Sequence, residues 1–264
     1  MMKVLFVGDV VGEPGRLTLY RALPELKSEY SIDAVVVNGE NAAGGRGITP
    51  AIAHDFFING VDVITLGDHV WDQAELAARI DELPTVLRPY NHQSNTPGCG
   101  SCVIATPAGS LGVLCLQGRT FMKTGVENPF SCAESAVESL RLTSGAQAIV
   151  VDFHAETTSE KIAMGRFLDG KVSAVLGTHT HVQTNDACLL PGGTAYLTDA
   201  GMCGPLDSVI GRSVEPVVNS FVTCMPRKFP VASWPTRLSG AVISIDETTG
   251  KALEITPLNR IYEK

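Results

Sequence analysis

Short apolar runs alternate with segments of helical periodicity along the first third of the chain, and this order constrains the fold more than any other feature. Parallel strands are joined by helical crossovers, because a tight turn cannot connect one strand to its parallel neighbour. The alternation therefore predicts an α/β fold with a largely parallel, helix-covered sheet. The apolar runs are 3–7, 33–37, 61–66 and 85–87, and the helical segments are 14–27, 51–59 and 72–82, the last with Asp72 as its expected N-cap.

The middle and the end of the chain depart from this rhythm. Segments 101–106 and 111–116 flank the turn-rich Pro107-Ala108-Gly109-Ser110 and are predicted to form a hairpin. Hairpins in the centre and strands at both ends predict two sheets, and the absence of a linker-like break predicts one domain over residues 1–264. The later strands are expected at 148–151, 173–176, 194–197, 240–245 and 252–257 and the later helices at 133–142 and 159–168, with a long irregular region before residue 240.

The overall charge and hydropathy exclude several classes of protein. The 264 residues carry a net charge of −8 and are 44% hydrophobic, so the chain can bury a sizeable core. General affinity for a nucleic-acid backbone needs clustered cations and is not expected, although a small anionic ligand is compatible with the composition. The first apolar run stops at Gly8-Asp9, and the rest of the sequence has no longer apolar run. This pattern indicates a soluble cytoplasmic protein without membrane contact. A homo-oligomer is also compatible with the sequence.

The seven cysteines are odd in number and scattered, which is typical of a protein in a reducing compartment. Cys99 and Cys102 form a CxxC motif, which can bind zinc or perform redox chemistry. Because no second CxxC accompanies it, free thiols in a loop are the expected state.

Residues with metal-binding side chains follow five of the predicted strands. In open α/β sheets, functional groups gather beyond the carboxyl ends of the strands, so these side chains are expected at one rim. Each has a structural alternative, such as a helix cap for Asp9, a turn for Asn41, or a surface pair for Asp68 and His69. The segments are Gly8-Asp9, Asn38-Gly39-Glu40-Asn41, Gly67-Asp68-His69, Asp152-Phe153-His154 and Gly177-Thr178-His179-Thr180-His181.

Carboxylates crowded at one rim repel one another, and bound metal ions would remove this cost. Mixed oxygen and imidazole donors suit manganese, iron or zinc better than calcium or magnesium. The donors are more numerous than one ion needs, so two ions bridged by a carboxylate are the economical arrangement. That geometry is used to hydrolyse phosphate esters.

The order of these motifs resembles the calcineurin-like metallophosphoesterase superfamily, and the longer motifs are similar to its YmdB-like branch. The resemblance runs essentially from end to end. It is carried by GDVVGEPGR at 8–16, NGENAAGGRGIT at 38–49, LGDHVWD at 66–72, DFHAETTSEK at 152–161, GTHTHVQT at 177–184, PGGTAYLTDAGMCGP at 191–205 and SVIG at 208–211. It implies a four-layer αββα sandwich of two facing mixed sheets, and hydrolysis of cyclic nucleotides, notably 2′,3′-cyclic nucleotides such as 2′,3′-cAMP.

The resemblance also implies two metal sites that share Glu40. One site would be completed by Asp9, Asn41 and His181, and the other by Asp68, His154 and His179. Iron or manganese is expected in both, with zinc as an alternative. A hydroxide that bridges the ions would attack phosphorus. His69 is expected to protonate the leaving ribose oxygen, or, in the alternative, to orient a ligand.

Two positions depart from the motifs of these families. Val11 stands where the superfamily has a histidine; the YmdB-like branch shares this gap, which Asn41 would fill. Asp68 stands where the branch usually has asparagine. With Asp68, two divalent ions, three carboxylates and a hydroxide sum to about zero charge instead of about +1. A more neutral centre should attract a phosphodiester anion less and acidify its bound water less.

The substrate contacts and the reaction leave alternatives open. Arg46 could bind phosphate, and Arg119 and Phe121 of another loop could receive a base, Phe121 by stacking, although loop or core roles compete with these. A small phosphodiester is the expected partner. A phosphatase acting on monoesters is an alternative within enzymes, and a metal-stabilised regulatory protein with weak or incidental activity is an alternative outside them.

Overall fold

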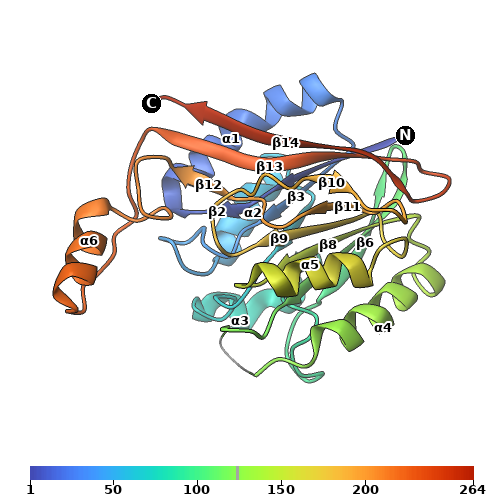
Figure 1. Cartoon of the computed structure of the whole chain (residues 1–264), viewed down its shortest axis with the longest axis horizontal. Coiled ribbons are helices and arrows are strands. Elements are labelled where there is room, and N and C mark those ends of the chain that lie inside the picture. The colour runs from blue at the N-terminus through green and yellow to red at the C-terminus, as the bar shows by residue number, and fades with distance from the viewer. Residues whose placement is uncertain (123–124) are drawn as a thin grey trace.

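Two β-sheets face each other at the centre of the molecule, and helices cover the outer face of each sheet (Figure 1). The computed structural model describes residues 1–122 and 125–264. The arrangement of the two sheets and their covering helices confirms the predicted four-layer αββα sandwich with two mixed sheets. None of the helices in the two described ranges is long and apolar enough to cross a lipid bilayer.

The first sheet has eight strands in the order β2-β12-β13-β1-β3-β4-β5, with β14 paired to β13. Strands β1, β3, β4 and β5 are parallel neighbours, as the alternation in the sequence predicted. Strand β13 pairs with β1 in the antiparallel sense, which makes the sheet mixed. The strands are β1 (Met2–Val7), β2 (Asp9–Val10), β3 (Ala34–Asn38), β4 (Val63–Thr65), β5 (Val86–Leu87), β12 (Met202–Pro205), β13 (Thr236–Ile245) and β14 (Ala252–Tyr262).

The second sheet has six strands in the order β10-β11-β9-β8-β7-β6. Strands β6 and β7 are antiparallel and form the predicted hairpin, whereas β7, β8, β9 and β11 are parallel. The strands are β6 (Ser101–Thr106), β7 (Gly109–Gln117), β8 (Ala148–His154), β9 (Ala174–Thr178), β10 (Cys188–Leu189) and β11 (Ala195–Leu197).

Helices from the first half of the chain cover the first sheet, and α4 and α5 cover the second. The predicted N-cap Asp72 is wrong. Helix α3 begins at Ala74 with Gln73 in the N-cap position, because the Asp72 carboxylate lies beside His69 instead. The helices are α1 (Gly12–Tyr30), α2 (Pro50–Ile58), α3 (Ala74–Arg79), the short 3-10 helix Ile80–Glu82, α4 (Pro129–Leu142), α5 (Thr158–Phe167) and α6 (Val214–Thr223).

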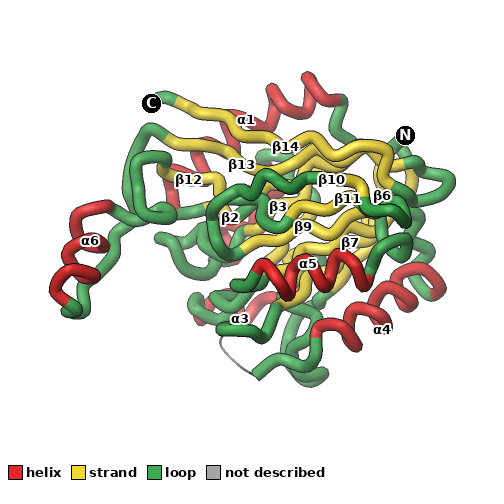
Figure 2. Tube along the Cα trace, viewed as in Figure 1, coloured by secondary structure: helices red, strands yellow, loops and turns green. Residues whose placement is uncertain are grey.

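The Gly-, Pro- and Ser-rich region before β13 is more ordered than the sequence suggested. It contains β12 and α6, and α6 projects away from the two sheets (Figure 2). Phe221 and Val222 on this helix are 79% and 78% exposed. Helix α6 was not predicted, although its apolar residues recur at helical spacing and Val217 is buried.

Successive side chains of each strand pack into different apolar layers, because a strand points them to opposite faces. In β1, Leu5 and Val7 pack towards the helices, whereas Val4 and Phe6 pack between the sheets. A third layer lies between the second sheet and helices α4 and α5. This packing holds the sheets face to face, so that side chains beyond β3 and at the end of β8 meet across the gap between them.

Candidate metal centre

The seven predicted ligands come together at one edge of the sandwich, where strands of both sheets end. The first sheet supplies four of them, from β2 and from the loops after β3 and β4. The second sheet supplies three, from the last residue of β8 and the loop after β9. They are Asp9, Glu40, Asn41, Asp68, His154, His179 and His181.

Four of these side chains form a tight group, in which one donor atom from each lies within 4.8 Å of the others. His154 Nε2 lies 3.1 Å from Glu40 Oε1 and 3.3 Å from Asp68 Oδ1. His179 Nδ1 lies 3.0 Å from His154 Nε2 and 3.5 Å from Asp68 Oδ1. Two imidazole nitrogens and two carboxylates at this range fit the donor set of a transition-metal ion.

Asp9, Asn41 and His181 form a second group beside the first. Asn41 Nδ2 lies 3.2 Å from His181 Nε2 and 3.5 Å from Asp9 Oδ1. The same amide nitrogen lies 3.3 Å from Glu40 Oε1, the oxygen that also faces His154. Glu40 therefore contacts both groups. A half-turn of the Asn41 amide would present its oxygen to a cation.

A glycine makes room for the close approach of Glu40 and His154. A Cβ atom on Gly67 would lie 2.2 Å from Glu40 Oε2 and 2.4 Å from His154 Nε2. Neither side chain could keep its position beside such an atom. The glycine before Asp68 is therefore required by the packing of the donors themselves.

Burial and mutual charge determine how the donors share protons. Burial raises the pKa of Asp9 to about 6, and the neighbouring His181 and His154 oppose this rise. Burial also acts to raise the pKa values of Glu40 and Asp68, but the charge and hydrogen bonds of His154 bring both below their usual range. In return, Glu40 raises the pKa of His154 well above its ordinary value, against the effect of burial. A proton on His154 thus neutralises carboxylate charge that a metal ion would neutralise in its place.

A buried polar chain holds His154 from behind. His154 Nδ1 lies 2.8 Å from Thr178 Oγ1, and that hydroxyl donates to Asp152 Oδ1 at 2.7 Å. The fully buried Asp152 also accepts from Asn38 Nδ2 at 2.9 Å and from Thr65 Oγ1 at 2.5 Å. Because the Thr178 hydroxyl is already a donor, it accepts the Nδ1 proton, which leaves Nε2 to face the two carboxylates.

The series of hydrogen bonds behind His154 was not predicted from the sequence. Asp152 lies two residues before His154, so both side chains leave β8 on the same face. A carboxylate within an otherwise apolar buried strand was the available signal. Its partners could not be identified, because Asn38 and Thr65 belong to the opposite sheet.

The two histidines after β9 have backbone dihedrals that non-glycine residues rarely adopt. The φ angle is +98° at His179 and +65° at His181. Asp9 Oδ2 accepts a hydrogen bond from the His179 amide at 3.0 Å. Asp199 Oδ2 accepts from both the amide and the hydroxyl of Thr180. Two buried carboxylates therefore hold the loop in the conformation that brings both histidines to the donors.

Lys161 is the counter-ion of Asp199 in the protein interior. Its Nζ lies 2.6 Å from Asp199 Oδ2, and both side chains are at most 2% exposed. We expect Lys161→Met to lower the free energy of unfolding by about 3–5 kcal/mol, because the carboxylate is left buried without a counter-ion. Urea denaturation measures this difference. The double variant Lys161→Met/Asp199→Asn should recover part of the loss, and the exposed control Lys171→Met should lose less than about 1 kcal/mol. A single variant as stable as the control would contradict this role.

His69 lines a hollow of about 290 Å³ that also contains members of both donor groups. Its Nδ1 lies 3.1 Å from Asp72 Oδ2, although the angle does not make a hydrogen bond. Its backbone N–H donates to Glu40 Oε2 at 3.3 Å. The imidazole therefore lies beside the donors and forms no hydrogen bond or ion pair with Glu40 or Asp68.

Of the three predicted substrate contacts, Arg46 lines this hollow, whereas Arg119 and Phe121 do not. Arg119 lines a separate hollow together with Phe130. Phe121 is 89% exposed and does not belong to the core, whereas Phe130 packs edge-on against Phe167 with ring centroids 5.5 Å apart. The substrate roles of Arg119 and Phe121 stay predictions.

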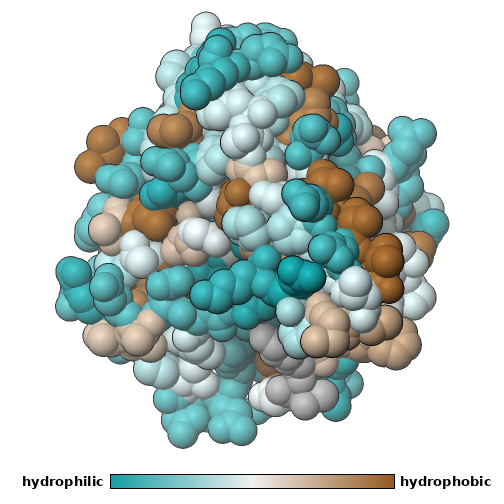
Figure 3. Space-filling view, turned by 90° about the vertical axis from the view of Figure 1, so that its left-hand side faces the viewer, coloured by the Kyte–Doolittle hydropathy of each residue, from teal (hydrophilic) through white to brown (hydrophobic). Residues whose placement is uncertain are grey.

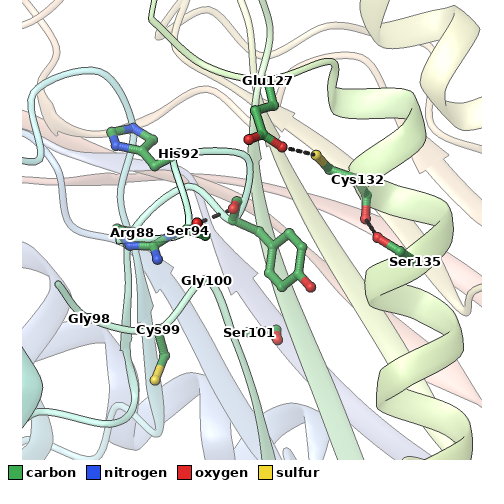
Figure 4. A pocket seen from close by; sticks show the side chains of 11 residues that line it. Arg88, His92, Ser94, Gly98, Cys99, Gly100, Ser101, Glu127, Cys132 and Ser135 are labelled. Atoms are coloured by element: carbon green, nitrogen blue, oxygen red, sulfur yellow. Dashed lines mark hydrogen bonds between the residues drawn. The ribbon is translucent and has the colours of Figure 1, made fainter. Parts of the chain in front are cut away.

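Another hollow, of about 470 Å³, lies beside α4 and is lined by Arg88, Cys99 and Cys132 (Figure 4). Arg88 donates to four backbone carbonyls of the loop 89–97, so its guanidinium serves to order that loop. Cys99 and Cys102 of the CxxC motif form no disulfide, but Cys102 lies on β6 and not in the expected loop. Among the described residues, the one group of side chains arranged to hold a metal is the group at the strand ends.

Comparison with known proteins identifies the family of this chain. The model of a protein family described as YmdB-like protein matches residues 5–258. The chain belongs to the YmdB-like family. It is 46% identical over 255 residues to the 2′,3′-cyclic-nucleotide 2′-phosphodiesterase of Bacillus subtilis, and the match covers 96% of this chain and 95% of that one.

Two solved structures resemble this YmdB-like protein along nearly its whole length. A hypothetical protein from Thermus thermophilus is 39% identical, with a TM-score of 0.91 and all of both chains covered. A phosphatase from Mycoplasma pneumoniae is 33% identical, with a TM-score of 0.92, covering 99% of this chain and 94% of that one. The names of the Bacillus subtilis and Mycoplasma pneumoniae relatives confirm the predicted reaction class, a phosphoric ester hydrolase.

Proposed function

We propose that this YmdB-like protein is a metal-dependent phosphodiesterase that hydrolyses 2′,3′-cyclic nucleotides such as 2′,3′-cAMP. The observation that carries the proposal is the position of Glu40, which contacts a group of one carboxylate and two imidazoles on one side and a second donor group on the other. A carboxylate between two donor sets is the arrangement of binuclear hydrolases. The Bacillus subtilis relative, named for this activity, supports the choice of substrate.

The donors fit two transition-metal ions, with iron or manganese preferred and zinc as an alternative. One ion would be held by Asp9, Asn41, His181 and Glu40, and the other by Glu40, Asp68, His154 and His179. Bound ions would supply Lewis acidity for the phosphoryl oxygens and a more acidic water. The polar chain through Asp152 would orient His154, and the bonds from Asp9 and Asp199 would orient the loop that carries the other two histidines.

In the proposed reaction, the oxygen of water forms a bond to phosphorus and the bond from phosphorus to the ribose O2′ breaks. The products are a 3′-phosphate and a free 2′-hydroxyl. The leaving O2′ needs a proton, which His69 would donate from the ring nitrogen opposite the one beside Asp72. Arg46 would neutralise phosphate charge at the mouth of the hollow.

A substrate panel with controlled metal loading tests this function. The purified protein should hydrolyse 2′,3′-cAMP to 3′-AMP, and should act more slowly on 3′,5′-cAMP and p-nitrophenyl phosphate. Chelation should remove the activity, and added Mn²⁺ or Fe²⁺ should restore it. Full metal loading without turnover of 2′,3′-cAMP would favour the regulatory alternative.

Asp68 provides a sharper test of the charge at the centre. Its carboxylate lies 3.3 Å from His154 Nε2 and 3.5 Å from His179 Nδ1, so an asparagine could keep these positions. We expect Asp68→Asn to retain both ions and to raise kcat at neutral pH by about three- to tenfold. The reason is that loss of a carboxylate raises the net charge of the centre by one. Metal analysis and steady-state kinetics measure both effects. Equal or lower turnover at full metal occupancy would count against the charge argument.

A further inference from the structure

A groove lined by four cations continues from the hollow over the metal donors. Its volume is about 510 Å³, and it shares two arginines with the hollow that contains His69. It lies on the side of the molecule that carries α6, where hydrophilic side chains cross the middle of the face (Figure 3). This basic groove is lined by Gly44, Arg46, Arg212, Arg227, Lys228 and Phe229. The concentration of cations is unusual, because the whole chain carries a net charge of −8.

The return segment after α6 forms one wall of the basic groove. Two backbone hydrogen bonds join the two ends of the segment that contains α6. They run from Ser213 N to Pro230 O and from Ala232 N to Gly211 O, and both are 2.9 Å long. They bring Arg227 and Lys228 back beside the body of the protein. The segment before α6 also reaches the metal donors, because His181 Nδ1 lies 3.0 Å from the carbonyl oxygen of Ile210, two residues before Arg212.

Arg212 is fixed at the junction of the hollow and the groove by backbone carbonyls. Its guanidinium donates to the carbonyls of Gly44 at 3.3 Å, Phe229 at 3.2 Å, and Gly45. A Cβ atom on Gly45, where φ is +91°, would lie 2.3 Å from Arg212 Nη1, so a glycine makes room for this contact. Burial and the nearby charge of Arg46 lower the pKa of Arg212.

The cations of the groove are available to an external anion. Within residues 1–122 and 125–264, Arg212, Arg227 and Lys228 form no ion pair with a carboxylate. Arg46 approaches Asp72 only at 4.0 Å and is 65% exposed. Like charges gathered without counter-ions disfavour one another, and a polyanion in the groove would relieve that repulsion.

We propose that the basic groove binds the RNA chain that precedes a 2′,3′-cyclic phosphate, so that the substrate is the cyclic end of a single-stranded oligonucleotide. This inference rests on the proposed function, because the cyclic phosphate must lie at the metal donors. A nucleoside 2′,3′-cyclic phosphate has one negative charge. Cations beyond the metal hollow therefore face further phosphates, which only a longer chain provides.

The chemistry of RNA supplies such ends. Attack of a ribose 2′-hydroxyl on its own 3′-phosphodiester forms the cyclic phosphate and releases the 5′-oxygen of the next nucleotide. The reaction that supplies this substrate is thus a transesterifying cleavage of RNA. Phe229, which is 40% exposed in the groove, offers a ring on which a base can stack. Because the rest of the protein is acidic, binding should be limited to a few nucleotides.

Kinetics on a matched pair of substrates test the inference. We expect kcat/KM for a tetra-adenylate ending in a 2′,3′-cyclic phosphate to exceed that for 2′,3′-cAMP by about tenfold at 50 mM salt. The variant Arg227→Gln/Lys228→Gln should remove this advantage and leave turnover of 2′,3′-cAMP unchanged. In a plot of log kcat/KM against log salt concentration, the variant should make the negative slope for the tetra-adenylate shallower by about 1.4, because two phosphate contacts are lost.

The control variant Lys171→Gln/Lys251→Gln makes the same change in net charge at exposed positions before β9 and β14, at the strand ends opposite the metal donors. It should keep the advantage of the tetra-adenylate. Equal kcat/KM for the two substrates in the unaltered enzyme, or equal losses in both variants, would overturn the inference while the proposed function stands.

A binding measurement separates this inference from the proposed function. Fluorescence anisotropy with a 5′-labelled tetra-adenylate 3′-phosphate, the expected product, requires no turnover. The Kd should rise about tenfold in Arg227→Gln/Lys228→Gln and stay constant in the control variant. If 2′,3′-cAMP is not hydrolysed but the Kd changes as expected, the proposed reaction fails and the groove is retained. An unchanged Kd would contradict the groove, whatever the activity.

Discussion

Replacing Glu40 with alanine is expected to lower kcat/KM for 2′,3′-cAMP by at least about 10³-fold and to reduce the metal content of the protein. Glu40 is 1% exposed, and its carboxylate lies 3.1 Å from His154 Nε2 and 3.3 Å from the Asn41 amide nitrogen. Its loss removes a donor from both sites at once. No other single substitution at the centre should affect both ions directly.

Metal analysis by mass spectrometry and steady-state kinetics on the same preparation measure the two effects together. The control Glu75→Ala removes a carboxylate of the same kind from an exposed position on α3 and should change neither quantity. The variant Glu40→Gln keeps the size of the side chain and removes its charge, so it should also lose activity. A Glu40→Ala protein that keeps two ions and a tenth of the activity would disprove the bridging role.

Replacing His69 with alanine is expected to lower kcat for 2′,3′-cAMP by about 10²- to 10⁴-fold while both ions remain bound. The side chain lines the hollow but forms no ion pair with Glu40 or Asp68, and its bond to Glu40 is through a backbone N–H that alanine retains. The loss should be smaller for a substrate whose leaving group needs no proton, such as bis-p-nitrophenyl phosphate. Comparing the two substrates therefore isolates proton donation.

The exposed His54 on α2 provides a matched histidine-to-alanine control, which should leave kcat and metal content unchanged. Loss of metal in His69→Ala, with equal effects on the two substrates, would assign His69 to the orientation of ligands. Such a result would leave the reaction without an identified proton donor.

The sequence predicted those features of the fold that follow from the spacing of apolar residues along the chain. Apolar runs predicted the strands, and the carboxyl ends of parallel strands predicted where polar side chains would gather. Glu40 and His154 thus meet across the two sheets, although they are 114 residues apart in the chain. Strand β2 was not predicted, because a strand of two residues leaves no periodic signal. Asp72 shows the opposite error, since a residue suited to cap a helix instead lies beside His69.

The supporting contacts of the site could not be predicted, because they depend on tertiary structure alone. Asp152 accepts hydrogen bonds from Asn38 and Thr65, which the facing sheet brings to it. Arg212 donates to the carbonyls of residues 44 and 45, which lie 168 and 167 residues away in the chain. The sequence identified which residue types would gather at the rim, whereas the structure shows what orients them and what lies beside them.

The position of the metal ions tests the central claim most directly. A crystal structure of the metal-loaded protein, with anomalous diffraction measured at the absorption edges of iron and manganese, locates each ion without reference to the protein contacts. The account predicts two ions about 3.5–4 Å apart, with Glu40 between them, Asp68, His154 and His179 on one, and Asp9, Asn41 and His181 on the other. A single ion, or two ions that do not share Glu40, would contradict it.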